Sequence, residues 1–522
     1  MLTEPTTTTA MQHASTIAAH RFGLSETGLA VLRDDPRGWV LAQLRAPQAL
    51  DGSGLKTSYE TLAMGRQVLR AALRAPSANA QAAVPPMAGN NADRMAGVGD
   101  PVAAMPSVER PYAGLPAARR NDAAAAGNAE RRQLVAAGSS ELQRRWQHMV
   151  TTPTPVAERW VQFWSNHFCV ASTKGTMLGM VWPFEREAIR PYAFGRFADL
   201  LRAATLHPSM LLYLDNAQSI GPNSQAGQRR DRGLNENLAR ELLELHTLGV
   251  HGGYTQADVT EGARLLTGWT VPRDPNGNAA GGLGARLAAA QIPSTDDAAA
   301  GRGIFVAALH EPGAKRVLGK SYADGPQAAE QWLADLARHP STATHVSTKL
   351  VRHFVTDDPP AVLVDAVAAR FRATDGDLLA VAQALFGHDL AWRGDLPPKF
   401  KRPEELLLSA HRVLKLPVQS QAQAARLGFA MAEMCQPPGR APSPQGWPDR
   451  QEDWLAPDAL WKRVEWASQF AQTAGTLADA RTLADASFGA DLGAETGRQI
   501  ERAESAAQAM ALLLASPEFL RR

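Results

Sequence analysis

The chain contains 522 residues, and its 54 basic side chains nearly match its 52 acidic ones, which leaves a net charge of +2. This balance argues against bulk attraction to nucleic acid or to an acidic membrane. A hydrophobic content of 45% is typical of a globular protein. Two cysteines, Cys169 and Cys435, are too few for a disulfide scaffold.

The sequence also lacks the usual signals for a membrane or for export. No apolar run approaches the roughly 20 residues of a membrane span. The first residues lack the basic region and the apolar core of a signal peptide. We therefore expect a cytoplasmic protein by default, and a periplasmic one only if a partner carries it across the membrane.

Composition divides the chain into three parts. Residues 1–75 have helical periodicity and are expected to pack on the main domain as N-terminal helices. Residues 76–140 are rich in Ala, Pro, Gly and Asn, which predicts a linker or insertion that is partly disordered. Residues 141–522 form the main helical domain, with a loop and hairpin insertion at about 271–320. The predicted fold is all-α and bundle-like, with one small β-hairpin.

Local signals locate several elements within this fold. In residues 304–319, two short extended runs flank Pro312-Gly313, so we expect the hairpin there, with His310 at its turn. Thr255 is expected to cap a helix that runs to about Leu266, and Pro403 fits the first position of another.

The most informative stretch is the leucine-rich helix predicted between Gly233 and Gly249. With about 100° per residue, its leucines form one broad arc, and Glu241 lies inside that arc. A carboxylate on an apolar face needs partners, because an unpaired buried charge is costly. Arg240 and Glu244 are expected to pair on the more polar side.

A second helix carries an aromatic stripe. Trp160, Phe163, Trp164 and His167 follow the spacing i, i+3, i+4 and i+7, so His167 should face the core. Cys169 points about 200° away from His167 on such a helix, which argues against a Cys–His nucleophile pair.

These residues suggest a polar pocket between helices, with Glu241, His167 and His246 as candidate acids and bases. The competing interpretation is a buried polar network that only fixes helix packing. The groups expected to orient a substrate are Asn166, Tyr213, Asp215, Asn216, Asn235, Asn237, Arg240, Glu244 and His310.

Lys399, Lys401 and Arg402 precede a predicted helix N-terminus, an arrangement that suits an anionic group. However, Glu404 and Glu405 follow directly and can satisfy the helix dipole themselves, so a self-paired helix entry is the alternative.

A metal site is not expected. His167, Glu241, His246 and His310 are ligand types, but their spacing matches neither His-Glu-x-x-His nor the Glu-x-x-His pairs of di-iron bundles. No other cofactor motif is present. A helix-turn-helix reading of residues 235–268 fails because its second helix carries acidic residues where phosphate contacts need Lys or Arg.

Several runs resemble the bacterial family catalogued as domain of unknown function 1800. They are residues 158–168, 207–216, 235–249, 253–261, 267–269, 349–355, 446–448 and 516–519. The resemblance covers roughly residues 15–75 and 141–522, and its longest motif is Asn235-Glu-Asn-Leu-Ala-Arg-Glu-Leu-Leu-Glu-Leu-His-Thr-Leu-Gly249. Members of the family often occur beside exported sulfatase-like proteins, which implies such a protein as a partner.

Two functions follow as hypotheses. The first is an enzyme that performs acid–base chemistry, hydrolysis or elimination, on a polar or anionic envelope molecule. The second is a non-catalytic scaffold or chaperone for an exported sulfatase-like protein. The sequence does not determine the substrate or the oligomeric state.

Overall fold

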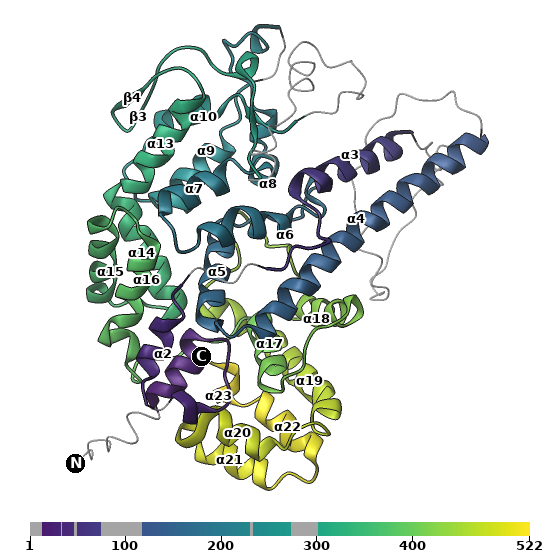
Figure 1. Cartoon of the computed structure of the whole chain (residues 1–522), viewed down its shortest axis with the longest axis vertical. Coiled ribbons are helices and arrows are strands. Elements are labelled where there is room, and N and C mark those ends of the chain that lie inside the picture. The colour runs from purple at the N-terminus through teal and green to yellow at the C-terminus, as the bar shows by residue number, and fades with distance from the viewer. Residues whose placement is uncertain (1–12, 33, 46–49, 75–116, 230–232, 273–300) are drawn as a thin grey trace, which may run out of the picture.

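The computed structural model describes residues 13–32, 34–45, 50–74, 117–229, 233–272 and 301–522. The molecule is elongated, and α5 (Pro155–His167) lies near its centre (Figure 1). Helices surround α5 on several sides, and the only strands among the described residues form two small antiparallel pairs. The predicted all-α class is therefore confirmed.

The N-terminal helices lie against the main body, and a helical arm projects from it (Figure 1). The arm consists of α3 (Ser58–Arg74) packed along the long helix α4 (Ala117–Thr151). The boundary predicted at residue 140 thus falls inside α4, because Ala-rich sequence also has high helix propensity. The earlier part of the predicted linker, 76–116, lies outside the described residues. The other N-terminal elements are η1 (Ile17–Phe22), η2 (Leu29–Leu32) and α2 (Pro36–Ala42).

Short helices follow α5 and build the upper part of the body in Figure 1. Those before the strands are η3 (Gly175–Met177), α6 (Val181–Phe184), η4 (Glu185–Ile189), η5 (Arg190–Tyr192), α7 (Phe197–Thr205), α8 (Pro208–Tyr213), η6 (Asn216–Gln218), η7 (Gly227–Arg229), α9 (Asn237–Glu241), η8 (Leu242–Thr247) and α10 (Gln256–Leu266). Thr255 caps α10 in a capping box with Asp258, as its position in the sequence predicts.

The predicted hairpin is displaced along the chain. β1 (Trp269–Thr270) pairs with β2 (Ile304–Phe305), and a hairpin joins β3 (Lys315–Val317) to β4 (Lys320–Tyr322). The turn uses Leu318 and Gly319, both at positive φ, as tight two-residue hairpin turns require. The prediction of a turn at Pro312-Gly313 was wrong, and the short helix η9 (Ala307–Leu309) interrupts the first expected strand.

The remaining helices form two groups. One group lies beside α5 and comprises α13 (Pro326–Arg338), α14 (Pro340–Phe354), α15 (Ala361–Ala373), α16 (Leu378–Gly387) and η10 (Asp389–Trp392). The other forms the lower end in Figure 1 and comprises α17 (Pro403–Val413), α18 (Gln421–Glu433), η11 (Gln451–Trp454), α19 (Pro457–Ala474), α20 (Ala480–Phe488), η12 (Gly489–Asp491), α21 (Ala494–Glu501), α22 (Ala506–Leu514) and α23 (Pro517–Leu520).

The predicted central helix changes its winding after Glu241. The first turn, α9, is an α-helix, and the next six residues form the π-helix η8. The Thr247 hydroxyl donates to the carbonyl of Leu242, five residues back. A π-turn advances each residue by less than 100°, so the arc expected for a regular helix does not continue past Glu241.

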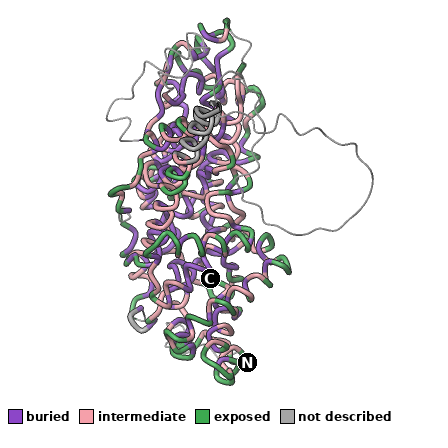
Figure 2. Tube along the Cα trace, turned by 90° about the vertical axis from the view of Figure 1, so that its right-hand side faces the viewer, coloured by how far each residue is buried: buried purple, intermediate pink, exposed green. Residues whose placement is uncertain are grey.

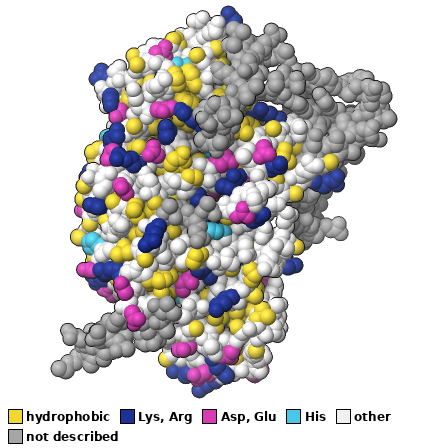
Figure 3. Space-filling model, viewed as in Figure 1, with side chains coloured by type: hydrophobic (Ala, Val, Ile, Leu, Met, Phe, Trp, Pro, Cys, Tyr) yellow, Lys and Arg dark blue, Asp and Glu magenta, His cyan; other side chains and the backbone are white. Residues whose placement is uncertain are grey.

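The hydrophobic interior has two large parts, and buried residues run along the length of the molecule (Figure 2). The aromatic face of α5 belongs to the first part, which also includes α7, α14 and α16. The second part joins α4 to α17, α19 and α22. On the face shown in Figure 3, charged side chains of both signs intermingle, as the net charge of +2 leads one to expect.

A buried layer of charge separates the two parts. The Arg190 guanidinium donates two hydrogen bonds of 2.6 Å to Glu158 on α5, and it also lies 3.2 Å from Glu185. Arg145 of α4 donates to Glu185 at 2.8 Å and to Glu404 at 2.6 Å. Burial alone would raise the pKa of Glu158, but its attraction and hydrogen bonds to Arg190 hold the pKa well below its usual value.

No helix in the described part of the chain has the length and apolar character needed to cross a membrane.

We expect Glu158→Gln to lower the free energy of unfolding by about 3 kcal/mol, because it leaves Arg190 buried with only one carboxylate. Urea denaturation at pH 7 measures this change. The control is Asp395→Asn, which breaks the exposed Arg393–Asp395 pair and should leave the free energy of unfolding nearly unchanged. Equal changes in the free energy of unfolding would show that the buried pair stabilises the fold no more than the exposed pair does.

Candidate functional site

The candidate site is built on α5, whose two faces differ in character. Trp160, Phe163 and Trp164 fill one face and are almost completely buried in the first hydrophobic part. On the opposite face, Gln162, Ser165 and Asn166 border a cavity. This division positions polar groups deep inside the protein, because the aromatic face anchors the helix.

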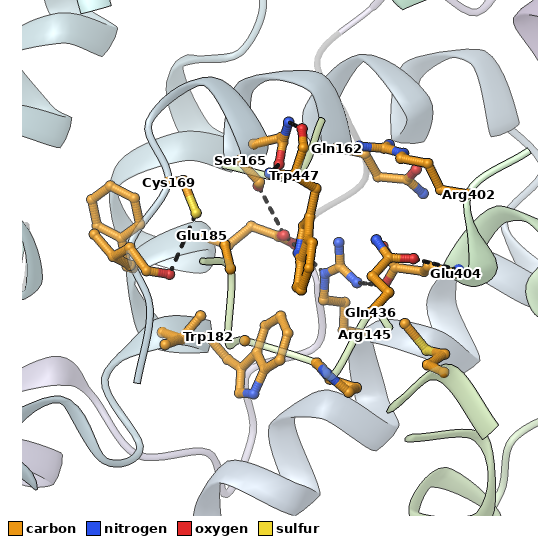
Figure 4. Close-up of a pocket in the computed structure, with 18 residues that line it drawn as sticks. Arg145, Gln162, Ser165, Cys169, Trp182, Glu185, Arg402, Glu404, Gln436 and Trp447 are labelled. Atoms are coloured by element: carbon orange, nitrogen blue, oxygen red, sulfur yellow. Dashed lines mark hydrogen bonds and ion pairs between the residues drawn. The ribbon is translucent and has the colours of Figure 1, made fainter. Parts of the chain in front are cut away.

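The cavity has a volume of about 70 Å³ and lies between α5, the α6–η4 turn, the start of α17 and the loop after α18 (Figure 4). Such a volume accommodates several water molecules or one small polar group. Its polar lining consists of Arg145, Gln162, Ser165, Asn166, Glu185, Arg402, Glu404 and Gln436.

Two donors in the cavity lack acceptors. Gln162 and Arg402 lie next to each other at one end of the cavity (Figure 4) and are 4% and 6% exposed. Among the described residues, no group accepts a hydrogen bond from Gln162 Nε2 or Arg402 Nε. The Arg402 guanidinium lies within ion-pair distance of one described carboxylate, that of Glu405, whose Oε1 is 3.6 Å from Nη2, longer than a hydrogen bond.

Glu405 cannot fully compensate Arg402, because it serves other arginines. Its Oε1 accepts a 2.7 Å hydrogen bond from Arg159 and lies 3.1 Å from Nε of Arg522. Three guanidinium groups therefore surround one carboxylate. Although burial opposes ionisation, their attraction lowers the pKa of Glu405 well below its usual value.

The cavity's own carboxylates are already committed. Glu185 accepts from Arg145 and from the Ser165 hydroxyl, both at 2.8 Å. Glu404 accepts from Arg145 at 2.6 Å and from the indole of Trp146 at 2.9 Å. Burial raises the pKa of Glu185, but the attraction of Arg145 and Arg190 lowers it by more than burial raises it. The net pKa lies below the usual value, so Glu185 stays ionised. Both carboxylates therefore already accept hydrogen bonds from protein groups.

Two tryptophans add flat apolar surface to the lining. Trp182 lies under the Arg145 guanidinium at 5.3 Å, a cation–π contact. Asn166 holds the backbone of Trp447 through two hydrogen bonds of 2.8 and 2.9 Å. Gly446, at φ +85°, precedes it, and a Cβ there would lie 2.5 Å from the Asn166 carbonyl. Asn166 therefore positions a wall of the cavity.

Cys169 borders the cavity at the end opposite Gln162 and Arg402 (Figure 4). It is a free, buried thiol, and Cys435 is a free, exposed one. Burial raises the pKa of Cys169 to about 12, so it is not a thiolate nucleophile at neutral pH. Burial also raises the pKa of nearby Tyr213, with smaller contributions from Cys169 and Glu241.

Glu241 does not acquire the partners that its position was expected to require. Its carboxylate is half-buried and has no hydrogen bond or ion pair with any described residue. Burial, followed by the charge of Glu244, raises its pKa, and Arg240 opposes this shift. The side chain can remain without a strong partner because it keeps part of its hydration.

His167 and His246 are buried beside each other, with ring centroids 6.1 Å apart. Nε2 of His167 lies 3.1 Å from the carbonyl of His246, and neither ring nitrogen of His246 has a partner among the described residues. Burial and the ammonium of Lys349 lower both pKa values, that of His246 to about 3. His345, 6.4 Å from His167, has its pKa lowered to about 4 in the same way.

Around α9, most predicted substrate-binding groups have structural partners. Asn235 Oδ1 accepts from the backbone of Asn237 and so starts the helix. Arg240 pairs with Glu236 at 3.0 Å and with Gln256 at 3.2 Å, so the expected pair with Glu244 was wrong. Because η8 begins after Glu241, Glu244 does not follow the i,i+4 geometry of a regular helix.

The other predicted groups lie apart from one another. Asp215 pairs with Lys174 at 2.5 Å. Asn216 donates to the carbonyls of Leu266 and Trp269 and so fixes β1. His310 lies 2.9 Å from Lys315 and 3.1 Å from Asp324, at the base of the hairpin.

The three cations before α17 also separate. Lys399 pairs with Asp357, and Lys401 donates to the Ser25 hydroxyl at 3.0 Å. Burial lowers their pKa values to about 8 and about 7, respectively. Only Arg402 borders the cavity. Of the predicted residues, the structure thus places Asn166 and Arg402 at the cavity, brings His167 and His246 together in the core, and places the others apart from both.

No group of three or more His, Cys, Asp or Glu side chains in the described ranges is arranged to hold a metal ion.

Four residues of the lining were not predicted from the sequence as site residues: Arg145, Gln162, Glu185 and Gln436. One signal could have identified part of this set: Glu158, Gln162, Ser165 and Asn166 recur at i, i+4, i+7 and i+8, opposite the aromatic stripe. The residues of α4, η4 and the loop after α18 carry no comparable local signal.

The buried histidines predict a pH dependence. An unfolded chain protonates histidine near pH 6.5, whereas folded His246 stays neutral down to about pH 3. The neutral histidine's contribution to the free energy of unfolding is therefore fully present above about pH 6.5. As the pH decreases toward 3, the free energy of unfolding falls by about 1.4 kcal/mol per pH unit for such a histidine. Denaturation between pH 5.5 and 4 should show a correspondingly shallower slope for His246→Leu. His251→Gln, at an exposed position, should keep the wild-type slope, and an unchanged slope in His246→Leu would contradict the assignment.

Comparisons with known proteins agree with the motifs. No curated protein and no solved structure matches the chain. A family model described as "Protein of unknown function (DUF1800)" matches residues 17–521, nearly the whole chain. The chain belongs to this family.

Proposed function

We propose that the protein binds a small ligand carrying an oxyanion, such as a carboxylate, sulfate or phosphate, in the cavity on the polar face of α5. The observation that carries this proposal is the pair of buried donors, Gln162 and Arg402, without acceptors among the described residues. A buried donor that lacks an acceptor costs about 1–3 kcal/mol. A ligand oxygen between the two side chains removes that cost.

The charge distribution favours an anion over a neutral acceptor. Arg402, Arg159 and Arg522 share one carboxylate, Glu405. Arg145 pairs with both carboxylates that border the cavity, and Arg190 also lies 3.2 Å from one of them, Glu185. A ligand with one negative charge therefore complements the local excess of guanidinium, and the Arg fork suits the planar geometry of a carboxylate.

The lining supports binding better than acid–base catalysis. It contains no histidine, and its two carboxylates accept hydrogen bonds from arginine. Trp182 and Trp447 offer flat surfaces to the remainder of a ligand, as in sites for ring-shaped polar molecules. Catalysis by Glu241, His167 or His246 stays a prediction, and so does a sulfatase-like partner.

The decisive variant is Gln162→Leu. It removes a buried amide that has no partner among the described residues while it keeps the side-chain volume, so we expect the ligand-free protein to gain about 1 kcal/mol of stability. The same variant should lose the stabilisation that sulfate, phosphate or acetate gives the wild type relative to chloride at equal ionic strength. Thermal and urea denaturation measure both effects, and a tenfold loss of affinity corresponds to about 1.4 kcal/mol at saturation.

A matched control is Gln43→Leu. Gln43 is also buried, but its amide accepts from Val156 and donates to Trp39, so its loss should destabilise the protein and leave the oxyanion response unchanged. Arg402→Gln should abolish the response as Gln162→Leu does. If Gln162→Leu is destabilising and responds to the anions like the wild type, the proposal is wrong.

A further inference from the structure

The N-terminal elements meet the C-terminal helices in the lower part of the molecule (Figure 1). A second cleft lies between residues of these two parts. It has a volume of about 340 Å³ and lies between η1, the segment 394–398, the end of α20 and α23. His20 connects these parts, because its Nε2 lies 2.7 Å from the carbonyl of Ser487 and its ring stacks on Phe488. The cleft shares no lining residue with the cavity on α5.

Arg21 is a buried cation in this cleft without a carboxylate partner. The residue is 5% exposed. Its Nη1 donates to the carbonyls of Ala391 and Arg393 at 2.9 and 3.0 Å, and Nε has no acceptor among the described residues. No described carboxylate lies within ion-pair distance of it. Burial, with a contribution from Arg522, lowers its pKa to about 10, so it is charged at neutral pH.

Neither acidic side chain of the cleft lies within ion-pair distance of Arg21, although Oδ2 of Asp491 has no hydrogen-bond partner among the described residues. Asp491 lies 3.1 Å from His13, and Glu518 accepts from the backbone of Gly493 and from the Thr496 hydroxyl. A buried guanidinium that keeps its charge requires a counter-ion or several acceptors, and the two carbonyls supply only part of that requirement.

The rest of the lining has an apolar part beside polar side chains that include Thr16, Arg521 and Arg522. Ile17, Leu396, Pro398 and Phe488 form this part of the wall. A dry cavity on the order of 150 Å³ already holds a benzene molecule, so the cleft has room for a ring or a short acyl chain beside Arg21.

We propose that this cleft binds a monocarboxylate with an apolar body, an aromatic or short-chain acid, whose carboxylate pairs with Arg21. The apolar walls remove the hydrocarbon part from water, and the guanidinium supplies the charge. The inference is independent of the function proposed for the α5 cavity, which is smaller and bordered by polar groups.

Isothermal titration with benzoate tests the proposal, with benzamide as the neutral analogue of the same shape. We expect benzoate to bind at least tenfold more tightly than benzamide, and Arg21→Gln to lower the benzoate affinity at least tenfold. Arg463→Gln is the matched control, since Arg463 is also buried and has no ion pair with a described residue, but lies outside the cleft lining. Equal binding of benzoate and benzamide, unchanged affinity in Arg21→Gln, or no benzoate binding at millimolar concentration would overturn the proposal.

Two further measurements apply even if Arg21→Gln fails to fold. Leu396→Trp fills the cleft from a half-buried position and should abolish benzoate binding while the protein stays folded. Photolysis of the wild type with 4-azidobenzoate should label peptides that contain residues 17–21, 394–398 or 488. Label only in other peptides, or loss of benzoate binding in Gln162→Leu but not in Leu396→Trp, would contradict the assignment to this cleft.

Discussion

The structure depends on the burial of charge between α5 and α17. A helix with aromatic side chains on one face and Glu158, Arg159 and Gln162 on the other cannot be covered by apolar residues alone. Each ion must find a partner of opposite charge: Arg190 pairs with Glu158, and Glu405 pairs with Arg159. The two hydrophobic parts thus meet through a polar layer, and both candidate binding sites lie beside it.

The layer contains more guanidinium than its carboxylates can fully engage. Glu405 lies between Arg402, which borders the α5 cavity, and Arg522, which borders the second cleft. The charge excess is therefore divided between two separate openings. Apolar residues of similar size often stabilise a fold as well as buried ion pairs do, so the ligands proposed above would give these arginines a role beyond stability.

The sequence predicted features that depend on neighbours along the chain. Short-range patterns predicted the helical class and the inward direction of His167. They also predicted that Thr255 caps α10 and that Pro403 is the first residue of α17. The hairpin turn was predicted at Pro312-Gly313 because that dipeptide is a typical turn sequence. The actual turn places Leu318 at positive φ, a conformation that a leucine in the sequence does not indicate. The π-helix after Glu241 also could not be predicted from the sequence, since its leucine spacing resembles that of a regular α-helix.

The candidate site was harder to predict because its residues come from distant segments. Asn166 and Arg402 were identified as polar groups in suggestive places, but the sequence did not indicate that they border one cavity. Gln162 was detectable from its place opposite the aromatic stripe. Arg145, Glu185 and Gln436 were not, because their proximity results from how α4, η4 and the loop after α18 pack.

The long helix α4 has a mechanical consequence. With 35 residues, it is about 50 Å long, and one rigid rod therefore extends from the projecting arm to the polar layer. Arg145 lies near its inner end, where it holds Glu185 and Glu404. A protein that bound the outer arm and tilted the rod would displace the arginine that pairs with both carboxylates of the cavity. Contact at the arm would then alter ligand affinity at the centre.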